Sequence, residues 1–172
     1  MVTVNRAQQQ NGEQILKITE KTKVFNKTEE SCVKELWEDY LYDGANSEYQ
    51  FLVGQIGDEV AGFICYGQHA LTEGAYDIYW IAVDPKFQKH GVGAVMIQRV
   101  WDEVKQLGGS LLIVETSSTP PYEPARNFYL RTGFILEATI HDFYSAGDHL
   151  QIYTKPVDKQ DIPHEDHLLQ QA

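Results

Sequence analysis

Hydrophobic residues recur at helical spacing in two stretches near the start of the chain. A helix is predicted over residues 12–24, where Ile15, Ile18 and Thr22 lie one turn apart. A second helix is predicted with Thr28 as its N-cap, because two acidic residues follow and the helix dipole favours negative charge in the first turn. Its apolar stripe is strongly amphipathic and consists of Val33, Leu36, Trp37, Tyr40 and Leu41.

The same spacing predicts two more helices in the second half of the chain. The longer one covers residues 91–107 and ends at two glycines, as helices often do. A shorter one covers residues 124–131 and is followed by Gly133. One side of the longer helix carries the stripe Val92, Met96, Val100 and Val104.

Alternating or continuous apolar runs predict strands in the rest of the chain. The helix over residues 91–107 joins two of these runs, 76–83 and 110–116, and such a crossover predicts a parallel pair within a mostly antiparallel sheet. A Gly-Asp turn at 57–58 predicts a hairpin. The predicted strands are 2–6, 49–56, 59–66, 76–83, 110–116, 135–144 and 149–155. The fold class is therefore α/β (α+β).

Length and composition favour one globular domain. The chain has 172 residues, 42% of them hydrophobic, with neither repeats nor a linker, so residues 1–156 are predicted to form the domain and 157–172 a polar tail. The net charge of −11 argues against binding to nucleic acid or acidic membranes. No apolar run is long enough to span a bilayer and the start is polar, which predicts a cytoplasmic protein. Cys32 and Cys65 are expected to be free thiols.

The segment 84–94 is the first with candidate chemistry. It leads from a strand into a long helix, whose first N–H groups are unpaired and carry partial positive charge. Gly91 and Gly93 allow an anion to approach the backbone, although glycines at a helix start often serve packing alone. The segment suits a pyrophosphate, yet it is neither a P-loop nor the dinucleotide fingerprint. Local positive charge comes from Lys86, Lys89 and His90.

The second such segment is residues 125–134, a short helix that ends in Gly133-Phe134. It carries Tyr129, four residues before the glycine. Taken alone, this tyrosine is typical of an aromatic residue that packs half-buried on a sheet.

Together, with one strand between them, the two segments resemble the GNAT superfamily of acyl-CoA-dependent N-acyltransferases. The family motif Gln/Arg-x-x-Gly-x-Gly/Ala reads Gln88-Lys89-His90-Gly91-Val92-Gly93 here. The strand and turn Ile81-Ala82-Val83-Asp84-Pro85 and the downstream Ala125, Phe128-Tyr129 and Gly133-Phe134 also agree with the family. The resemblance covers roughly residues 1–155 in element order and is specific over 76–134. It implies a sheet whose central parallel strands splay, with helices on both faces.

The resemblance also implies acetyl-CoA as co-substrate. Main-chain groups of Ile81 and Val83 would bond the pantetheine arm and the acyl carbonyl like an added strand, and N–H groups of residues 88–94 would hold the pyrophosphate. One departure is Tyr122, which stands where many members carry an asparagine that bonds pantetheine. The expected cofactor-binding residues are Ile81, Ala82, Val83, Gln88, Lys89, His90, Gly91, Val92, Gly93, Ala94 and Tyr129. No metal is expected, because the tail sequence His164-Glu165-Asp166-His167 is not a zinc motif.

The reaction implied is direct transfer of an acetyl group to a primary amine, with Tyr129 as the general acid for the leaving thiolate. Asp77 is the first candidate for the base, acting directly or through water, because it lies six residues before Val83, where several members carry a glutamate. Strand alternation is expected to place both on one face together with Tyr79 and Ile81. Three alternatives stay open. Asp77 could be a carboxylate that only orients the substrate, Glu115 could be the base, and His69 and Glu73 could line the acceptor site.

The rival hypothesis is a GNAT-fold module that binds acyl-CoA without catalysis, as a sensor or scaffold. A dinucleotide-dependent enzyme is a third, and it predicts that NAD binds in preference to CoA. The acceptor, a small-molecule amine or a protein amino group, is not identified by the sequence. A homodimer also stays open.

Overall fold

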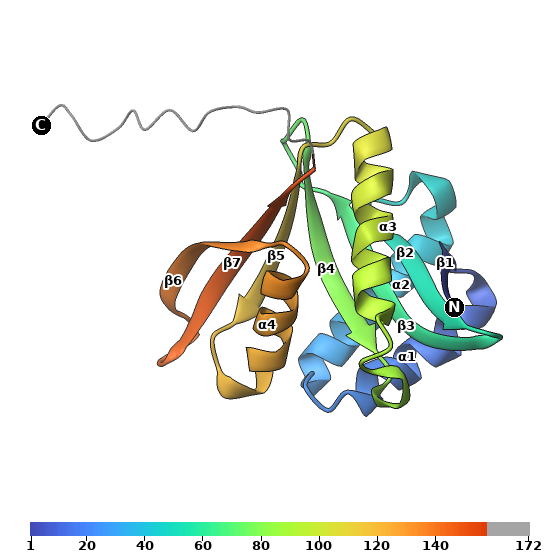
Figure 1. Cartoon of the computed structure of the whole chain (residues 1–172), viewed down its shortest axis with the longest axis horizontal. Coiled ribbons are helices and arrows are strands. Elements are labelled where there is room, and N and C mark those ends of the chain that lie inside the picture. Colours follow the sequence, from blue (N-terminus) through green and yellow to red (C-terminus); the bar gives the residue numbers. More distant parts are fainter. Residues whose placement is uncertain (158–172) are drawn as a thin grey trace, which may run out of the picture.

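The computed structural model describes residues 1–157, which form one seven-stranded sheet with the order β1-β2-β3-β4-β5-β7-β6 (Figure 1). All the predicted helices and strands are present, with ends within three residues of those expected. Val157 is buried and donates its N–H to Ser110, so it belongs to the fold; the rest of the predicted tail, including residues 164–167, lies outside the described residues. The elements are β1 Val2–Arg6, α1 Gly12–Lys21, α2 Lys27–Asp43, β2 Gln50–Ile56, β3 Glu59–Gln68, β4 Ala75–Val83, α3 Val92–Gln106, β5 Leu111–Ser117, α4 Glu123–Arg131, β6 Ile135–Ser145 and β7 Asp148–Pro156.

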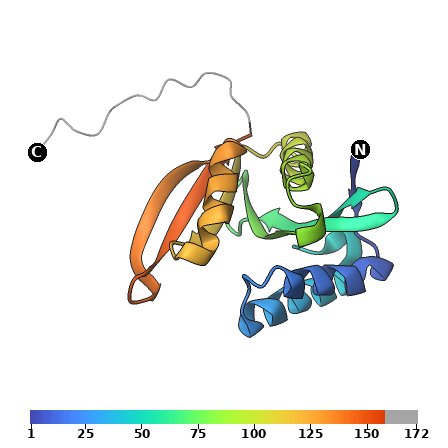
Figure 2. The ribbon, with the colours of Figure 1, turned by 60° about the horizontal axis from the view of Figure 1, so that its bottom comes forward.

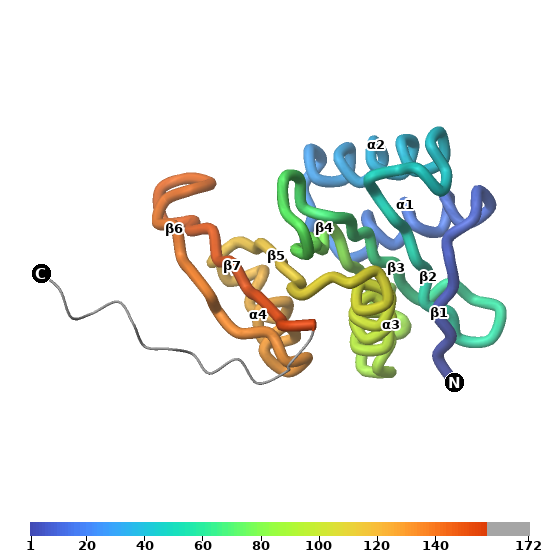
Figure 3. Tube along the Cα trace, turned by 90° about the horizontal axis from the view of Figure 1, so that it is seen from above, coloured from blue at the N-terminus to red at the C-terminus, as the bar shows by residue number. Residues whose placement is uncertain are grey.

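Helices cover both faces of the sheet. Figure 3 shows α1 and α2 on one face and α3 and α4 on the other. Each face has its own apolar core, and the predicted stripe of α3 is fully buried in one of them. None of the helices within residues 1–157 is long and apolar enough to cross a membrane. The core under α1 and α2 includes Ile15, Val33, Trp37, Phe51 and Phe63, and the core under α3 and α4 includes Leu52, Ile64, Met96, Leu112 and Tyr129.

The start of α2 differs from the sequence prediction. The N-cap is Asn26 rather than Thr28, and the helix begins at Lys27. The Asn26 side chain accepts a hydrogen bond from the Glu29 N–H at 2.9 Å, and the Glu29 carboxylate accepts one from the Asn26 N–H at 2.7 Å. This reciprocal capping box satisfies two N–H groups, which a cap at Thr28 would leave unpaired.

The cap makes a direct prediction about stability. Asn26→Ala is expected to lower the free energy of unfolding by about 1 kcal/mol, because it removes the acceptor for the Glu29 N–H. Thr28→Ala is the matched control and is expected to change stability by less than about 0.5 kcal/mol, since the Thr28 side chain makes no hydrogen bond within residues 1–157. Urea denaturation measures both. Equal losses would show that the capping box does not stabilise the helix.

The parallel pair β4 and β5 is joined over only half its length. Residues 75–78 of β4 pair with 111–114 of β5, and no pairing continues beyond them although β4 runs on to Val83. In Figure 1 the two strands lie side by side at the top of the sheet and diverge toward the bottom. The splay implied by the resemblance is therefore present.

A β-bulge lies in β4 where the strands begin to part. The pairing with β3 moves from Cys65 opposite Trp80 to Tyr66 opposite Ile78, so Tyr79 is the extra residue. An extra residue reverses the alternation of side chains beyond it. Ile78 before the bulge and Ile81 after it thus face the same core, the one under α3 and α4.

The bulge corrects one sequence prediction. Asp77 does not share a face with Ile81 and Val83, because its neighbours Tyr76 and Ile78 already face the α3 and α4 side. Asp77 faces the side of α1 and α2 instead, as Trp80 and Ala82 do. The simple alternation would hold only in a strand without the extra residue.

Candidate active site

A cleft of about 700 Å³ opens where β4 and β5 part. Its walls come from β4, β5, α4 and the start of α2, which are distant in the sequence. Figure 2 shows β5, β6, β7 and α4 diverging from the part of the sheet formed by β1 to β4. The cleft therefore lies between these two parts of the sheet, and its lining includes residues from both faces.

Tyr129 reaches the cleft from α4. It is 6% exposed, and its ring packs against Phe134 and Tyr153 at centroid distances of 5.8 and 5.9 Å. Within residues 1–157 its hydroxyl has no hydrogen-bond partner, although it lines the cleft. Burial raises the pKa of Tyr129 above the ordinary value for a phenol. The hydroxyl is thus a protonated donor that has no partner within the described residues.

Asp77 and Glu115 reach the cleft from the other face of the sheet. The Asp77 carboxylate lies 2.6 Å from Nδ1 of His69, which comes from the loop between β3 and β4. Glu115 extends from β5, where its neighbours Leu112 and Val114 point into the core under α3 and α4, so its side chain points the opposite way. The structure thus brings Asp77, Glu115 and His69 to the cleft, whereas Glu73 is not part of its lining.

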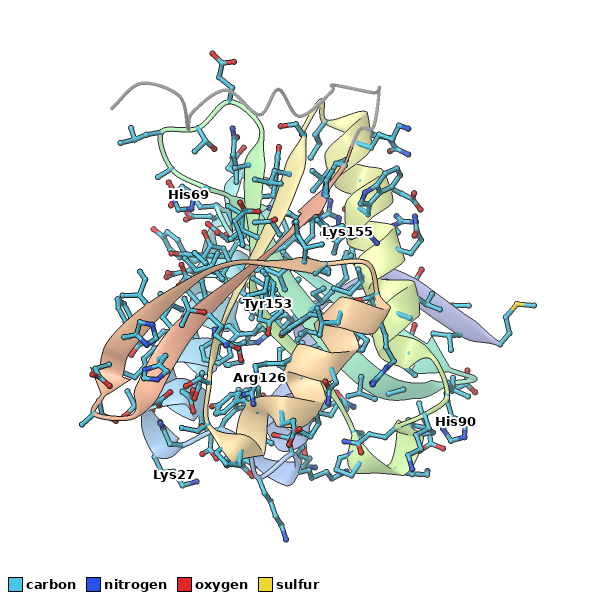
Figure 4. The ribbon with its side chains drawn as sticks, turned by 60° about the vertical axis from the view of Figure 1, so that its left-hand side comes forward. Lys27, His69, His90, Arg126, Tyr153 and Lys155 are labelled. Atoms are coloured by element: carbon cyan, nitrogen blue, oxygen red, sulfur yellow. The ribbon has the colours of Figure 1, made fainter. Side chains whose placement is uncertain are left out.

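The loop before α3 presents backbone N–H groups to the solvent. The N–H groups of residues 89–94 donate to no acceptor within residues 1–157, and both Lys89 and Gly91 have positive φ, at 66° and 77°. A side chain at Gly91 would meet nothing within 4 Å, so the space beside this backbone is open. Figure 4 shows His90 in this loop. Such an open row of N–H groups at a helix N-terminus is a suitable site for a phosphate.

Gly93 has a packing role as well. A Cβ atom there would lie 2.9 Å from Cζ of Phe128, so the absence of a side chain lets α3 and α4 pack closely. A role of Gly93 in the packing of α3 against α4 is compatible with a role of its backbone in binding an anion. Gly91, with open space beside it, is the position at which a ligand can come closest to the backbone.

The main chain of β4 has free groups facing the cleft. The N–H of Asp84 bonds the carbonyl of Ala61 on β3 at 2.8 Å, and in an antiparallel pair alternate residues point toward the partner. Ala82 therefore points its peptide groups toward β3, whereas those of Ile81 and Val83 point toward the gap left by β5. Of the three predicted residues, Ile81 and Val83 are the ones that can bond an extended ligand through the main chain.

Tyr122 lines the cleft. Its hydroxyl donates to Oε1 of Glu29 at 2.8 Å and so joins the start of α4 to the start of α2. On the same side of the cleft, Arg126 of α4, labelled in Figure 4, donates to the carbonyls of Ser117 and Thr119. At the position where the family resemblance implies a pantetheine-binding asparagine, this chain thus has a contact between the starts of α4 and α2.

Sequence reasoning did not find several residues of the cleft. Glu29, Tyr144 and Asp148 line it, from α2, β6 and β7. For Glu29 the Asn-x-x-Glu spacing at 26–29 is a signal, but only of a helix start. No group of metal-ligating side chains occurs in the described part of the chain.

Comparison with known proteins identifies the family. The model of the acetyltransferase (GNAT) family matches residues 13–134. A solved structure from Desulfovibrio desulfuricans, assigned to the GNAT family, has 38% identity and a TM-score of 0.88, with 92% of this chain and 100% of that chain covered. No curated protein matches.

More distant structures share the fold. The ribosomal-protein-S18-alanine N-acetyltransferase from Escherichia coli has 18% identity and a TM-score of 0.73, with 94% and 97% of the two chains covered. An aminoglycoside 6'-N-acetyltransferase solved with coenzyme A has 14% identity and a TM-score of 0.71, with 93% and 99% covered. With the family match over most of the domain, the chain belongs to the GNAT family of acetyltransferases.

Proposed function

We propose that this protein transfers an acetyl group from acetyl-CoA to a primary amine by direct attack, with Tyr129 as acid and Asp77 as base. The observation that carries the proposal is the position of the two side chains at one cleft, reached from opposite faces of the sheet. An amine that enters from the side of Asp77 and a thiolate that leaves toward Tyr129 would then have separate routes.

The chain has groups that fit the diphosphate and the pantetheine arm of acetyl-CoA. When bound, acetyl-CoA supplies the acetyl group as an activated thioester. N–H groups of residues 89–94 would hold the diphosphate, helped by the positive charge of Lys89. Main-chain groups of Ile81 and Val83 would bond the pantetheine arm, which would lie beside β4 where β5 no longer pairs with it. The rest of the predicted set, Gln88, His90, Val92, Gly93 and Ala94, belongs to the same loop and first helical turn.

Asp77 addresses the protonation of the acceptor. An alkylamine has a pKa near 10, so only about one molecule in a thousand is nucleophilic at pH 7, which corresponds to about 4 kcal/mol. The Asp77 carboxylate would take the excess proton, directly or through a water molecule. Its contact with His69, whose side chain is half exposed, offers a route by which the proton reaches the solvent.

Tyr129 addresses the leaving group. A thiolate with an ordinary pKa near 8.5 leaves more readily when a donor protonates it. A phenol is protonated throughout the neutral range, and no acceptor in residues 1–157 competes for the proton of the Tyr129 hydroxyl, which lines the cleft. This supports Tyr129 as the acid.

The structural neighbours support an amino group as acceptor. One is named for the alanine of a ribosomal protein and another for an aminoglycoside, so enzymes with this fold are named for a protein amino group and for a small-molecule amine. We propose one of these two kinds of acceptor here.

The direct test is release of free thiol from acetyl-CoA with and without primary amines. We expect release to depend on the amine and the acetylated amine to appear in equal amount by mass spectrometry. A protein that binds CoA in calorimetry but releases no thiol with any amine would instead be a binding module.

A further inference from the structure

The carboxylates in the described lining of the cleft outnumber its basic side chains. Four carboxylates line the cleft and no lysine or arginine does. Three of the four have no ion pair within residues 1–157, and the fourth, Asp77, pairs only with His69. The four are Glu29, Asp77, Glu115 and Asp148.

Within residues 1–157, Glu29, Glu115 and Asp148 have no counter-ion. The oxygens of Glu29 accept from the Asn26 N–H and the Tyr122 hydroxyl, and Asp148 accepts from the Ser117 hydroxyl, all of them neutral donors. Glu115 has no hydrogen bond within the described residues. Carboxylates gathered in a partly enclosed cleft favour a bound cation and disfavour an anion.

Two of the carboxylates lie near each other and share the cleft lining with an aromatic residue. Asp148 accepts from Ser117, which is two residues from Glu115 on β5, and Tyr144 lines the same cleft. Burial and then the negative charges of Glu115, Asp148 and Glu29 raise the pKa of Tyr144. Rings of Tyr79, Trp80 and Tyr144 line the same cleft. Aromatic faces bind both the methylene groups of an aliphatic chain and an ammonium ion.

One of the other carboxylates lies at some distance from Asp77, the proposed base. Asp77 is paired with Ile113, and Glu115 lies two residues further along β5, so the two Cα atoms are roughly 8 Å or more apart from strand geometry alone. Tyr129 also lines the cleft and is 6% exposed, and its hydroxyl has no partner among the described residues, which points to a ligand independently of the charges.

From these observations we propose that the acceptor is an aliphatic amine with a second ammonium group, a diamine or polyamine. The reacting amine lies at Asp77, and the second ammonium lies between Glu115 and Asp148 against the Tyr144 ring. The proposal rests on the proposed function. It also disfavours free amino acids, because the described lining offers no lysine or arginine to pair with an α-carboxylate.

Three primary amines with four carbons each test this in the full chain with acetyl-CoA: putrescine, butylamine and γ-aminobutyrate. They differ at the fourth carbon, which carries an ammonium in putrescine, is a methyl group in butylamine and is a carboxylate in γ-aminobutyrate. We expect kcat/KM for putrescine to exceed that for butylamine by about tenfold or more, and γ-aminobutyrate to be the poorest. Equal values for putrescine and butylamine would overturn the proposal while leaving amine acetylation intact. If these three amines and longer polyamines are all inactive but another amine reacts, the polyamine proposal is overturned and the proposed function stands. If no amine reacts at all, both are overturned.

A variant locates the second ammonium. Glu115→Gln is expected to reduce the ratio of kcat/KM for putrescine to that for butylamine by about tenfold. Glu38→Gln, on α2 and outside the cleft lining, removes the same charge and is expected to leave the ratio unchanged. If Glu115 were the base, both amines would slow equally and the ratio would hold, which would contradict its assignment to the second ammonium.

Discussion

Tyr129→Phe is expected to lower kcat by about a hundredfold or more while the affinity for CoA changes little. The substitution removes only the hydroxyl, which has no hydrogen-bond partner within residues 1–157, and leaves the ring that packs against Phe134 and Tyr153. The loss should therefore lie in the chemical step rather than in folding or binding. Thiol-release kinetics with a saturating amine measure kcat, and calorimetry measures the affinity for CoA.

Tyr153→Phe is the matched control. Tyr153 is similarly buried and adjacent, but its hydroxyl bonds the side chain of Gln151 at 3.1 Å and it is not part of the cleft lining. We expect its kcat to stay within about threefold of that of the parent protein. If Tyr129→Phe retained full kcat, Tyr129 would not be the acid and its buried hydroxyl would need another explanation.

Asp77→Asn is expected to lower kcat/KM for the amine at pH 7 by about tenfold to a hundredfold, because the variant has lost the carboxylate that takes the proton. It then depends on amine that is already free, so its kcat/KM should rise about tenfold per pH unit up to the pKa of the amine. In the parent protein the rise should level off at a lower pH. The pH profile of kcat/KM for both proteins measures this difference.

The control for the lost charge is Asp58→Asn, in the turn between β2 and β3 and outside the cleft lining. Its profile should coincide with that of the parent protein. A profile of Asp77→Asn that keeps the parent shape at a uniformly lower rate would make Asp77 an orienting carboxylate. In that case the same profile for Glu115→Gln would decide whether Glu115 is the base.

Local patterns were sufficient to predict the elements of this fold. Stripes such as that of α3 depend only on residues within one helix, and the crossover from β4 to β5 follows from the order of the elements. The motif residues around Gly91 and Tyr129 also lie in single segments, so the sequence could indicate both. The family match confirms the resemblance that these segments carried.

The bulge at Tyr79 could not be predicted from the sequence. A bulge is defined by which residues of the neighbouring strand pair with it, and β3 and β4 could pair with or without the extra residue. It reverses the face of Asp77 and so moves the candidate base away from Ile81 and Val83 and toward the charged side of the cleft. For a similar reason the sequence did not predict the cleft residues Glu29, Tyr144 and Asp148, because only the folded chain brings them together.

The central claim is that acetyl-CoA binds in the gap between β4 and β5 with its diphosphate at the start of α3. Hydrogen exchange of the full chain with and without CoA tests this claim most directly. We predict slower exchange in residues 80–95, where the free N–H groups lie, and no change in residues 36–43, the C-terminal part of α2, which lies outside the cleft lining. NAD at the same concentration should protect neither segment. Unchanged exchange over residues 80–95 at saturating CoA, or equal protection by NAD, would contradict the account.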